Sequence, residues 1–154
     1  MKKVCVKIIC EDGVKLPEQM TIGSSGMDVY AFISEPIVLN SLERTLVRTG
    51  IRVEIPLGYE IQVRPRSGLA IKYGISLLNT PGTIDSDYRG EIKVIVANLS
   101  CDSYTIMPLE RIAQFVLVKI ENIEWQQVHV VAIQGKIRRN NVTRKWESLC
   151  HYIR

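Results

Sequence analysis

The chain has 154 residues, of which 46% are hydrophobic and 23% are charged, a balance typical of one globular domain. No apolar run approaches the roughly 20 residues that cross a bilayer, and residues 1–13 lack the apolar core and cleavage site of a signal peptide. These features exclude a membrane-spanning chain, and we expect a cytoplasmic domain with no membrane partner.

The positive charge is concentrated at the C-terminal end. Residues 135–154 carry six Lys/Arg and one acid, a net charge of +5, whereas the 14 basic and 15 acidic residues before them give −1. We therefore divide the chain into a β domain, residues 1–134, and an atypical basic tail, residues 135–154. Such a tail can contact an anion or nucleic acid, or it can be a solvated end. Because the domain is nearly neutral, we expect no nucleic-acid partner.

The four cysteines, Cys5, Cys10, Cys101 and Cys150, form no C-x-x-C pair, and no His stands at metal-ligand spacing from them. We expect buried, reduced thiols, which agree with a cytoplasmic location.

Strand patterns dominate the chain. Short segments rich in Val, Ile and Tyr, several of them alternating apolar with polar residues, are separated by turn signals such as "GSSG" and "PLGYE". In chain order, the expected strands cover residues 4–9, 27–32, 45–55, 59–65, 74–79, 91–99, 111–120 and 126–131. The only internal helix candidate is residues 67–74, and residues beyond 135 could be helix or coil. This pattern predicts an all-β sandwich, jelly roll or barrel.

The stretch "GSSGMDVYA" places Asp28 at the start of an expected strand, after a small, flexible turn. Its carboxylate would suit the water shell of a metal ion, and the alternative is an acid that only ends a turn.

The stretch "RPRSGLAIKYG" combines the donors of an anion site. Arg66 offers a planar fork suited to phosphate, Ser67 a hydroxyl, and Gly68 a backbone that an anion can approach. The alternative is structural: Ser67 caps the helix and the arginines are solvated.

The stretch "NTPGTIDSDYRGEIKV" contains two carboxylates, Asp85 and Asp87, that would share a face in an extended segment. Arg89 could keep one of them ionised, and Tyr88 could lie against a sugar or a base. A held carboxylate can act as a general base or help to hold Mg²⁺, and the alternative is a polar hairpin. In "ERIAQFV", Gln114 lies inside an apolar strand and needs a polar partner or a ligand.

Together these four stretches, in this order and spacing, resemble four of the five motifs of the trimeric dUTPase family, and the resemblance runs from about Val4 to Val131. It implies a jelly-roll-like β-barrel or sandwich with one short helix, and a homotrimer with active sites at subunit junctions. It also implies the hydrolysis of dUTP to dUMP and pyrophosphate with Mg²⁺, which limits uracil in DNA and supplies dUMP for dTMP synthesis.

The resemblance also assigns roles to residues. Asp85 would be the general base, and Asp28 would contact the metal indirectly, through water. Substrate-binding residues would be Arg66, Ser67, Gly68, Asn79, Tyr88 and Gln114. Of these, Asn79 would read the uracil edge, and Tyr88 would pack under the deoxyribose and exclude a 2′-hydroxyl.

The fifth motif of the family, a glycine-rich arm with an Arg and a Phe, is absent, since no glycine follows Gly135. Arg138, Arg139 or Arg144 could supply the phosphate charge and Trp146 the stacking ring; alternatively the tail does neither, or the coding frame differs from the usual one. The alternative function is therefore a catalytically impaired nucleotide-binding or protein-interaction module. A dCTP deaminase shares the fold, but it would need a Glu base and another motif in place of "IDSDYRG".

Overall fold

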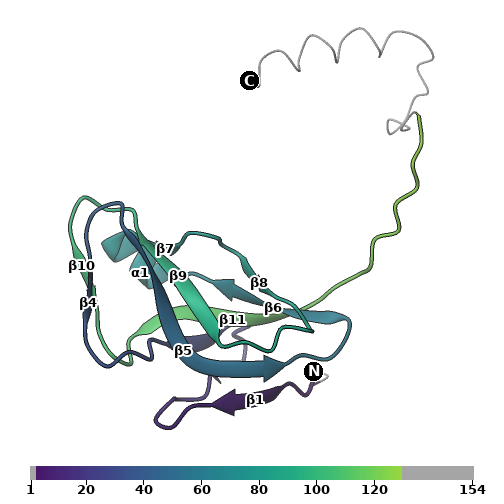
Figure 1. The fold of residues 1–154 in the computed structure, drawn as a ribbon, viewed down its shortest axis with the longest axis horizontal. Coiled ribbons are helices and arrows are strands. Elements are labelled where there is room, and N and C mark those ends of the chain that lie inside the picture. Colours follow the sequence, from purple (N-terminus) through teal and green to yellow (C-terminus); the bar gives the residue numbers. More distant parts are fainter. Residues whose placement is uncertain (1–2, 130–154) are drawn as a thin grey trace, which may run out of the picture. The chain divides into compact units, whose positions relative to one another are not determined.

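The computed structural model describes residues 3–129 of the chain. The tail candidates Arg138, Arg139, Arg144 and Trp146 lie outside the described residues. The chain divides into two units after Glu121. The first unit, residues 1–121, holds all the described strands and the helix (Figure 1), and the described part of the second, residues 122–129, is exposed and has no helix or strand.

Eleven strands and one helix make up the described part of the β domain. The strands are β1 (Lys7–Cys10), β2 (Glu18–Gln19), β3 (Met27–Tyr30), β4 (Ile37–Leu39), β5 (Arg44–Glu54), β6 (Tyr59–Arg64), β7 (Ile75–Leu77), β8 (Gly82–Ile84), β9 (Ile92–Asn98), β10 (Tyr104–Ile106) and β11 (Arg111–Lys119), and the helix is α1 (Ser67–Tyr73). The prediction of an all-β fold with one short helix is confirmed.

The strands form two large sheets and one small one, all antiparallel. One sheet has the order β1-β5-β9-β7, the second β2-β3-β11-β6-β8, and β10 pairs with β4. Buried side chains of both large sheets, such as Ile51 and Val94 from the first and Val29 and Phe115 from the second, belong to one core. The domain is therefore a sandwich in which the two large sheets (Figure 1) pack against each other through their apolar faces.

The helix between β6 and β7 begins without a side-chain cap and ends at a glycine. Its N-cap is Arg66, without a side-chain cap, so Ser67 is the first helical residue and the alternative that Ser67 caps the helix is wrong. Gly74 ends the helix with φ of 67°, the left-handed conformation that glycine adopts easily. In residues 3–129 no helix is long and apolar enough to span a membrane.

Several expected strands have different limits. The first begins at Lys7 instead of residue 4, because its pairing with β5 runs only from Lys7–Glu54 to Cys10–Ile51. Over the described residues 126–129, the strand expected at 126–131 is wrong: these residues are exposed and have no partner strand to satisfy their backbone groups.

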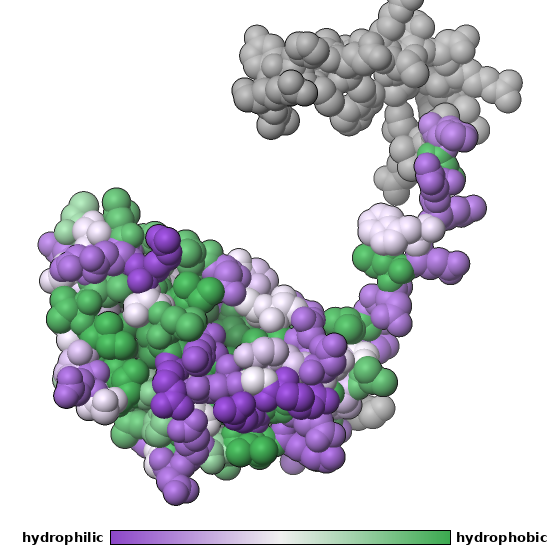
Figure 2. All heavy atoms as spheres, in the orientation of Figure 1, coloured by the Kyte–Doolittle hydropathy of each residue, from purple (hydrophilic) through white to green (hydrophobic). Residues whose placement is uncertain are grey.

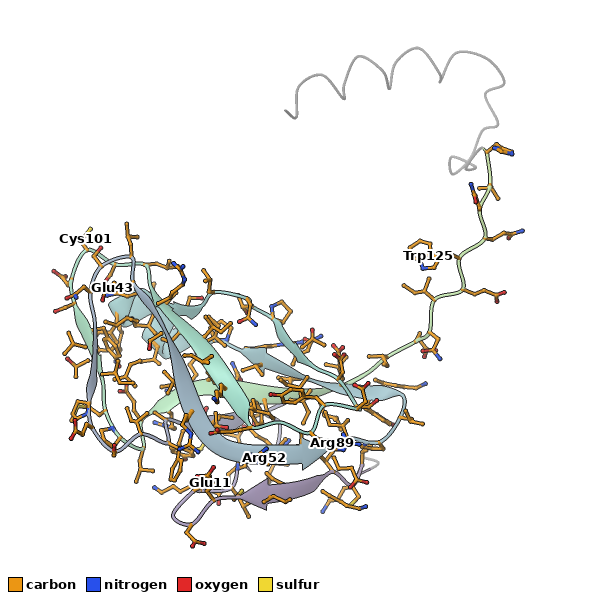
Figure 3. The ribbon with its side chains drawn as sticks, viewed as in Figure 1. Glu11, Glu43, Arg52, Arg89, Cys101 and Trp125 are labelled. Carbon is orange, nitrogen blue, oxygen red and sulfur yellow. The ribbon has the colours of Figure 1, made fainter. Side chains whose placement is uncertain are left out.

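The expectation of buried cysteines is also wrong for the described thiols. Cys5 and Cys101 are exposed and Cys10 is partly buried, and all three are free. Figure 3 shows Cys101 in the loop next to β10, and Cys150 lies outside the described residues.

Apolar side chains also lie at the surface of the β domain. Figure 2 shows them in green over the region of β4, β5 and β10. Exposed members on these strands and the turn between β4 and β5 include Val38, Leu42 and Leu46. Contiguous exposed apolar surface of this kind is typical of an interaction site.

Candidate active site

A buried carboxylate with two arginines lies where β3, β11 and the end of β6 meet. Asp28 on β3 is only 8% exposed. Arg66 Nε lies 3.0 Å from its Oδ1, and Arg111 Nη1 lies 3.1 Å from its Oδ2. Arg66 Nη1 also donates to the main-chain oxygen of Arg111 at 3.2 Å. A buried carboxylate needs such partners, and two guanidinium groups on one carboxylate leave a net positive charge.

Gln114 lies opposite Asp28 in the register of β11 and β3. Its Nε2 donates to the main-chain oxygen of Pro65 at 2.9 Å, so the polar partner that the sequence required for Gln114 is found. Gly26 leaves room for this side chain, because a Cβ atom there would lie 2.0 Å from Gln114 Oε1. We call Asp28, Arg66, Arg111 and Gln114 the arginine cluster. Ser67 and Gly68 are exposed directly after Arg66.

A second polar group surrounds β8. Asn79 is exposed, and its side chain lies against Gly82, where a Cβ atom would be 3.2 Å from Asn79 Nδ2. Asp85 follows β8 and is exposed, and its main-chain oxygen accepts the Tyr88 N–H at 3.1 Å. The Tyr88 hydroxyl donates to the main-chain oxygen of Glu91 at 3.0 Å. We call Asn79, Asp85 and Tyr88 the hairpin group.

Arg89 does not pair with an acid, contrary to the expectation for Asp85 or Asp87. Its Nη1 donates to the main-chain oxygens of Ser86 at 2.7 Å and of Tyr88 at 2.9 Å, so Arg89 closes the turn. The turn also approaches β5, where Arg52 Nη1 lies 3.5 Å from the Arg89 main-chain oxygen (Figure 3).

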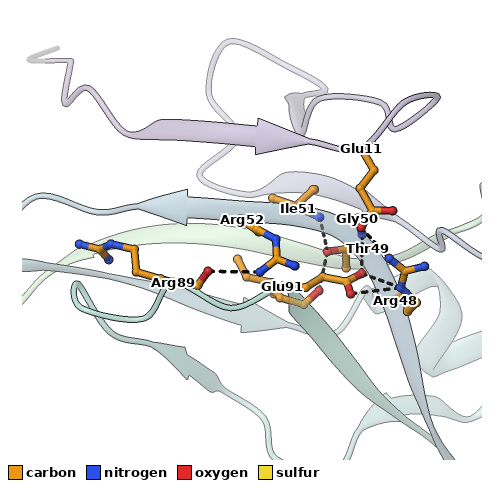
Figure 4. A network of polar contacts seen from close by, with 9 residues as sticks. Glu11, Arg48, Thr49, Gly50, Ile51, Arg52, Arg89 and Glu91 are labelled. Carbon is orange, nitrogen blue, oxygen red and sulfur yellow. Dashed lines mark hydrogen bonds and ion pairs between the residues drawn. The ribbon is translucent and has the colours of Figure 1, made fainter.

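Glu91 was not identified from the sequence, although it follows the hairpin group directly. Its Oε1 accepts the Gly50 N–H at 2.9 Å and Arg48 Nε at 3.0 Å, and Arg48 Nη2 continues to Glu11 Oε1 at 2.6 Å (Figure 4). Burial raises the pKa of Glu91, but the Gly50 N–H and the Arg48 guanidinium outweigh it, so the pKa lies below its usual value. The carboxylate is therefore an ionised anchor between β9 and β5.

Glu110 and Tyr104 form another contact that the sequence did not reveal, just before β11. The Tyr104 hydroxyl donates to the Glu110 carboxylate, which also accepts the Met107 N–H at 2.9 Å. Burial, helped by the neighbouring carboxylate, raises the pKa of Tyr104 above its ordinary range. This contact fixes the turn that leads into Arg111.

The arginine cluster and the hairpin group lie at different levels of β6. The register pairs Gly82 with Val63 and Ile84 with Ile61, so Asp85 follows β8 at the level of Glu60. Arg66 lies beyond the other end of β6, past Arg64. At about 3.3 Å per residue, the step from residue 60 to residue 64 alone spans about 13 Å. The register therefore holds Asp85 apart from Arg66, whereas Asn79, which lies against Gly82, is at the level of Val63.

Comparisons with known proteins identify the family of the chain. Residues 12–142 match the dUTPase family. The chain belongs to this family. It is 70% identical over 128 residues to a deoxyuridine 5′-triphosphate nucleotidohydrolase of Fusobacterium nucleatum, covering 83% of this chain and 88% of that protein. A protein of the same description from Finegoldia magna is 59% identical over 126 residues, 82% of this chain and 88% of that protein.

Solved dUTPase structures share the fold. A dUTPase variant of Staphylococcus bacteriophage 80alpha superposes with a TM-score of 0.77 at 23% identity, covering 90% of this chain and 97% of that chain. A mutant dUTPase from phage phi11 of S. aureus, described with a structural Mg(II) ion, gives a TM-score of 0.74 at 22% identity over 83% of this chain and 99% of that chain. The predicted dUTPase type of fold is confirmed.

Proposed function

We propose that Asp85 is the general base of dUTP hydrolysis in this chain. The chain is a dUTP diphosphatase, and it hydrolyses dUTP to dUMP and pyrophosphate. This reaction limits uracil in DNA and supplies dUMP for dTMP synthesis. Asp85 is exposed at the end of β8, beside Tyr88 and away from Arg66 and Arg111, so a water molecule can reach its carboxylate.

Asp85 and Arg66 are separated along β6, and this separation bears on how many subunits build the active site. Within one chain the main chain at Asp85 and at Arg66 lies toward opposite ends of β6, more than about 13 Å apart, which favours a site whose two halves come from different subunits. We therefore propose a homotrimer in which the hairpin group of one subunit faces the arginine cluster of the next. The exposed apolar side chains near β4 and β5 support a large interface.

In this assembly the arginine cluster binds the triphosphate. Arg66 and the Gln114 side chain would contact phosphate oxygens, together with the Ser67 hydroxyl and the main chain at Gly68. Asp28 holds Arg66 and Arg111 in place, so their donors are oriented before the substrate arrives. Guanidinium groups fixed in this way stabilise the charge that grows on the phosphates in the transition state.

The hairpin group binds the deoxyuridine part of the substrate. Asn79 would read the uracil edge, and the Tyr88 ring would pack under the deoxyribose. The Tyr88 hydroxyl donates to the main-chain oxygen of Glu91, which holds the ring in place. A ring fixed in this way can exclude the 2′-hydroxyl of a ribonucleotide sterically.

Mg²⁺ is the expected metal, and the residues fit an ion that is carried by the substrate. In residues 3–129 no group of three His, Cys, Asp or Glu side chains could hold a metal. Both oxygens of Asp28 already meet arginines, so Asp28 would reach Mg²⁺ only through water. When bound, the ion neutralises charge on the triphosphate oxygens.

In the chemical step, the deoxyuridylyl group of dUTP is transferred from pyrophosphate to water. Asp85 accepts a proton from the water molecule, and the water oxygen forms a bond to the α-phosphorus. The bond from that phosphorus to the bridging oxygen breaks, and pyrophosphate leaves with the electron pair. A general base of this kind contributes about 10²- to 10⁴-fold to the rate.

Asp85→Asn tests the assignment, with Asp87→Asn as the matched control in the same exposed turn. We expect Asp85→Asn to reduce pyrophosphate release from dUTP by about 10²- to 10⁴-fold and to keep binding of a non-hydrolysable dUTP analogue. Asp87→Asn should retain turnover. Equal losses in both variants, or full activity of Asp85→Asn, would refute the role of Asp85. Release from dTTP, dCTP and UTP measures selectivity in the same assay.

The role of the basic tail in binding dUTP stays a prediction, and so does the boundary that separates the tail from residues 1–134. Replacing Arg138, Arg139 and Arg144 with Gln, and separately Trp146→Ala, tests whether the tail supplies the missing phosphate charge and stacking ring. A higher KM for dUTP would support these roles, and unchanged kinetics would exclude them. A cytoplasmic location and the lack of a nucleic-acid partner also remain predictions.

A further inference from the structure

We propose that Glu91 is a positioning residue that fixes Tyr88 and thereby sets the discrimination between dUTP and UTP. The inference rests on the proposed contact of Tyr88 with the deoxyribose. It adds a specificity-determining contact, made by a side chain that does not touch the substrate.

The main chain of Glu91 holds the Tyr88 ring from one side. The Tyr88 hydroxyl donates to the Glu91 oxygen at 3.0 Å, and the ring lies directly against Gly90. A Cβ atom at Gly90 would come within 2.4 Å of the hydroxyl oxygen, so only glycine allows this approach. The position of Tyr88 therefore depends on where residues 90 and 91 lie.

The side chain of Glu91 sets where those residues lie. Its carboxylate accepts hydrogen bonds from the Gly50 N–H and from Arg48 Nε, and the side chain is only 9% exposed. Both donors belong to an irregular part of β5, where the register shifts between Arg48 and Ile51. Gly50 has φ of 66° and is buried, so the bulge that points its N–H at Glu91 is itself constrained (Figure 4).

The remaining contacts of the turn are local. Tyr88 N–H bonds to Asp85, and Arg89 bonds to Ser86 and Tyr88, all within the same exposed loop. Arg52 reaches the turn at only 3.5 Å. Among the described side chains of residues 85–91, the Glu91 carboxylate is thus the one that bonds directly to β5, next to the pairing of Ile92 with Ile51.

This link matters because dUTP and UTP differ by a single hydroxyl group. Steric exclusion of that group requires a ring whose position is fixed to a fraction of an ångström. A turn that can shift would accommodate the hydroxyl, so loosening the anchor should raise the turnover of UTP more than it lowers that of dUTP.

Glu91→Gln and Arg48→Lys test the anchor from its two ends. Gln keeps an acceptor for the Gly50 N–H but loses the charge that pairs with Arg48, and Lys cannot reproduce the geometry of the guanidinium. For each variant we expect the ratio of kcat/KM for dUTP to that for UTP to fall about 10-fold, mainly through a lower KM for UTP. Glu54→Gln, which removes an exposed carboxylate of β5 paired with Lys7, is the matched control and should leave the ratio unchanged.

A double-mutant cycle with Tyr88→Phe separates positioning from general destabilisation. Removing the hydroxyl should also lower the ratio, and the combined Tyr88→Phe and Glu91→Gln variant should lose less than the product of the two separate effects. Denaturant unfolding of each variant identifies loss of folded protein. Variants that are destabilised but keep the full ratio, or effects that simply multiply, would overturn the inference.

Tyr88→Ala distinguishes this inference from the proposed function. If Tyr88→Ala relaxes the exclusion of UTP but Glu91→Gln and Arg48→Lys do not, Tyr88 keeps its role and Glu91 loses its own. If Tyr88→Ala leaves the exclusion of UTP intact, both assignments are overturned.

Discussion

Arg66 Nε lies 3.0 Å from Asp28 Oδ1, although 38 positions separate these residues in the sequence. The carboxylate is buried, and Arg111 approaches its other oxygen. Asp28 therefore acts first on the protein itself, by orienting two cations that would otherwise repel each other.

Asp28→Asn should weaken both stability and substrate binding. The amide cannot balance two guanidinium groups, so we expect a loss of about 1–3 kcal/mol in the free energy of unfolding. Without a fixed Arg66, kcat/KM for dUTP should fall about 10-fold or more. Urea unfolding at fixed protein concentration and pyrophosphate release measure the two effects. The exposed Asp12→Asn variant is the control, and equal behaviour of the two variants would contradict the prediction.

Gly26→Ala should displace Gln114. The new methyl group would lie 2.0 Å from Gln114 Oε1, and the flexible amide must turn away and lose its bond to Pro65. We expect KM for dUTP to rise several-fold while most of the stability is kept. Gly23→Ala is the matched control, because a Cβ atom there meets nothing within 4 Å. Unchanged KM in Gly26→Ala would remove Gln114 from the binding site.

Gly50→Ala should destabilise the protein more than Gly13→Ala. Both glycines have positive φ, 66° and 84°, so both substitutions carry backbone strain. Only at Gly50 would the Cβ atom collide with side chains, at 2.5 Å from Val14 and 2.9 Å from Phe32. The extra overpacking should cost about 1–3 kcal/mol in the free energy of unfolding, measured by urea denaturation. Equal losses in the two variants would show that the side chains move aside freely.

Because the pKa of Glu91 is lowered in the folded protein, we expect the protein to lose stability in acid. Its pKa in the folded state lies below the usual 4.5, so its contribution to stability is present above that value. The contribution disappears as the pH falls through the pKa of the folded state. Glu91→Gln should therefore flatten the dependence of unfolding free energy on pH in the acid range. A pH dependence identical to that of the unchanged chain would show that Arg48 and Gly50 do not hold the ionised form.

The sequence predicted the long strands well, because their apolar residues alternate over enough positions to show the period. β6, for example, was expected over residues 59–65 and covers Tyr59–Arg64. Strands of two or three residues, such as β2 and β8, have no measurable period, and neither is among the strands that the sequence predicts. The strand expected at 126–131 failed over its described residues, because apolar pattern alone does not supply a partner strand.

The candidate site was predicted in its members but not in its internal contacts. Local motifs indicated Asp28, Arg66 and Asp85. The pairing of Asp28 with Arg111 depends on the register of β3 and β11 across 83 positions, which no local pattern contains. Glu91 stood inside a quoted motif, but its donors lie more than forty positions away, at a bulge that a single sequence does not reveal.

The distance between Asp85 and Arg66 along β6 has a genetic consequence. In a homotrimer with shared sites, a chain with Asp85→Asn and a chain with Arg66→Gln would each be inactive alone. Mixed together, they would form trimers in which one junction joins an intact Asp85 to an intact Arg66. Two defective alleles of this gene would then complement each other within a single assembly, whereas a chain carrying both substitutions would rescue neither.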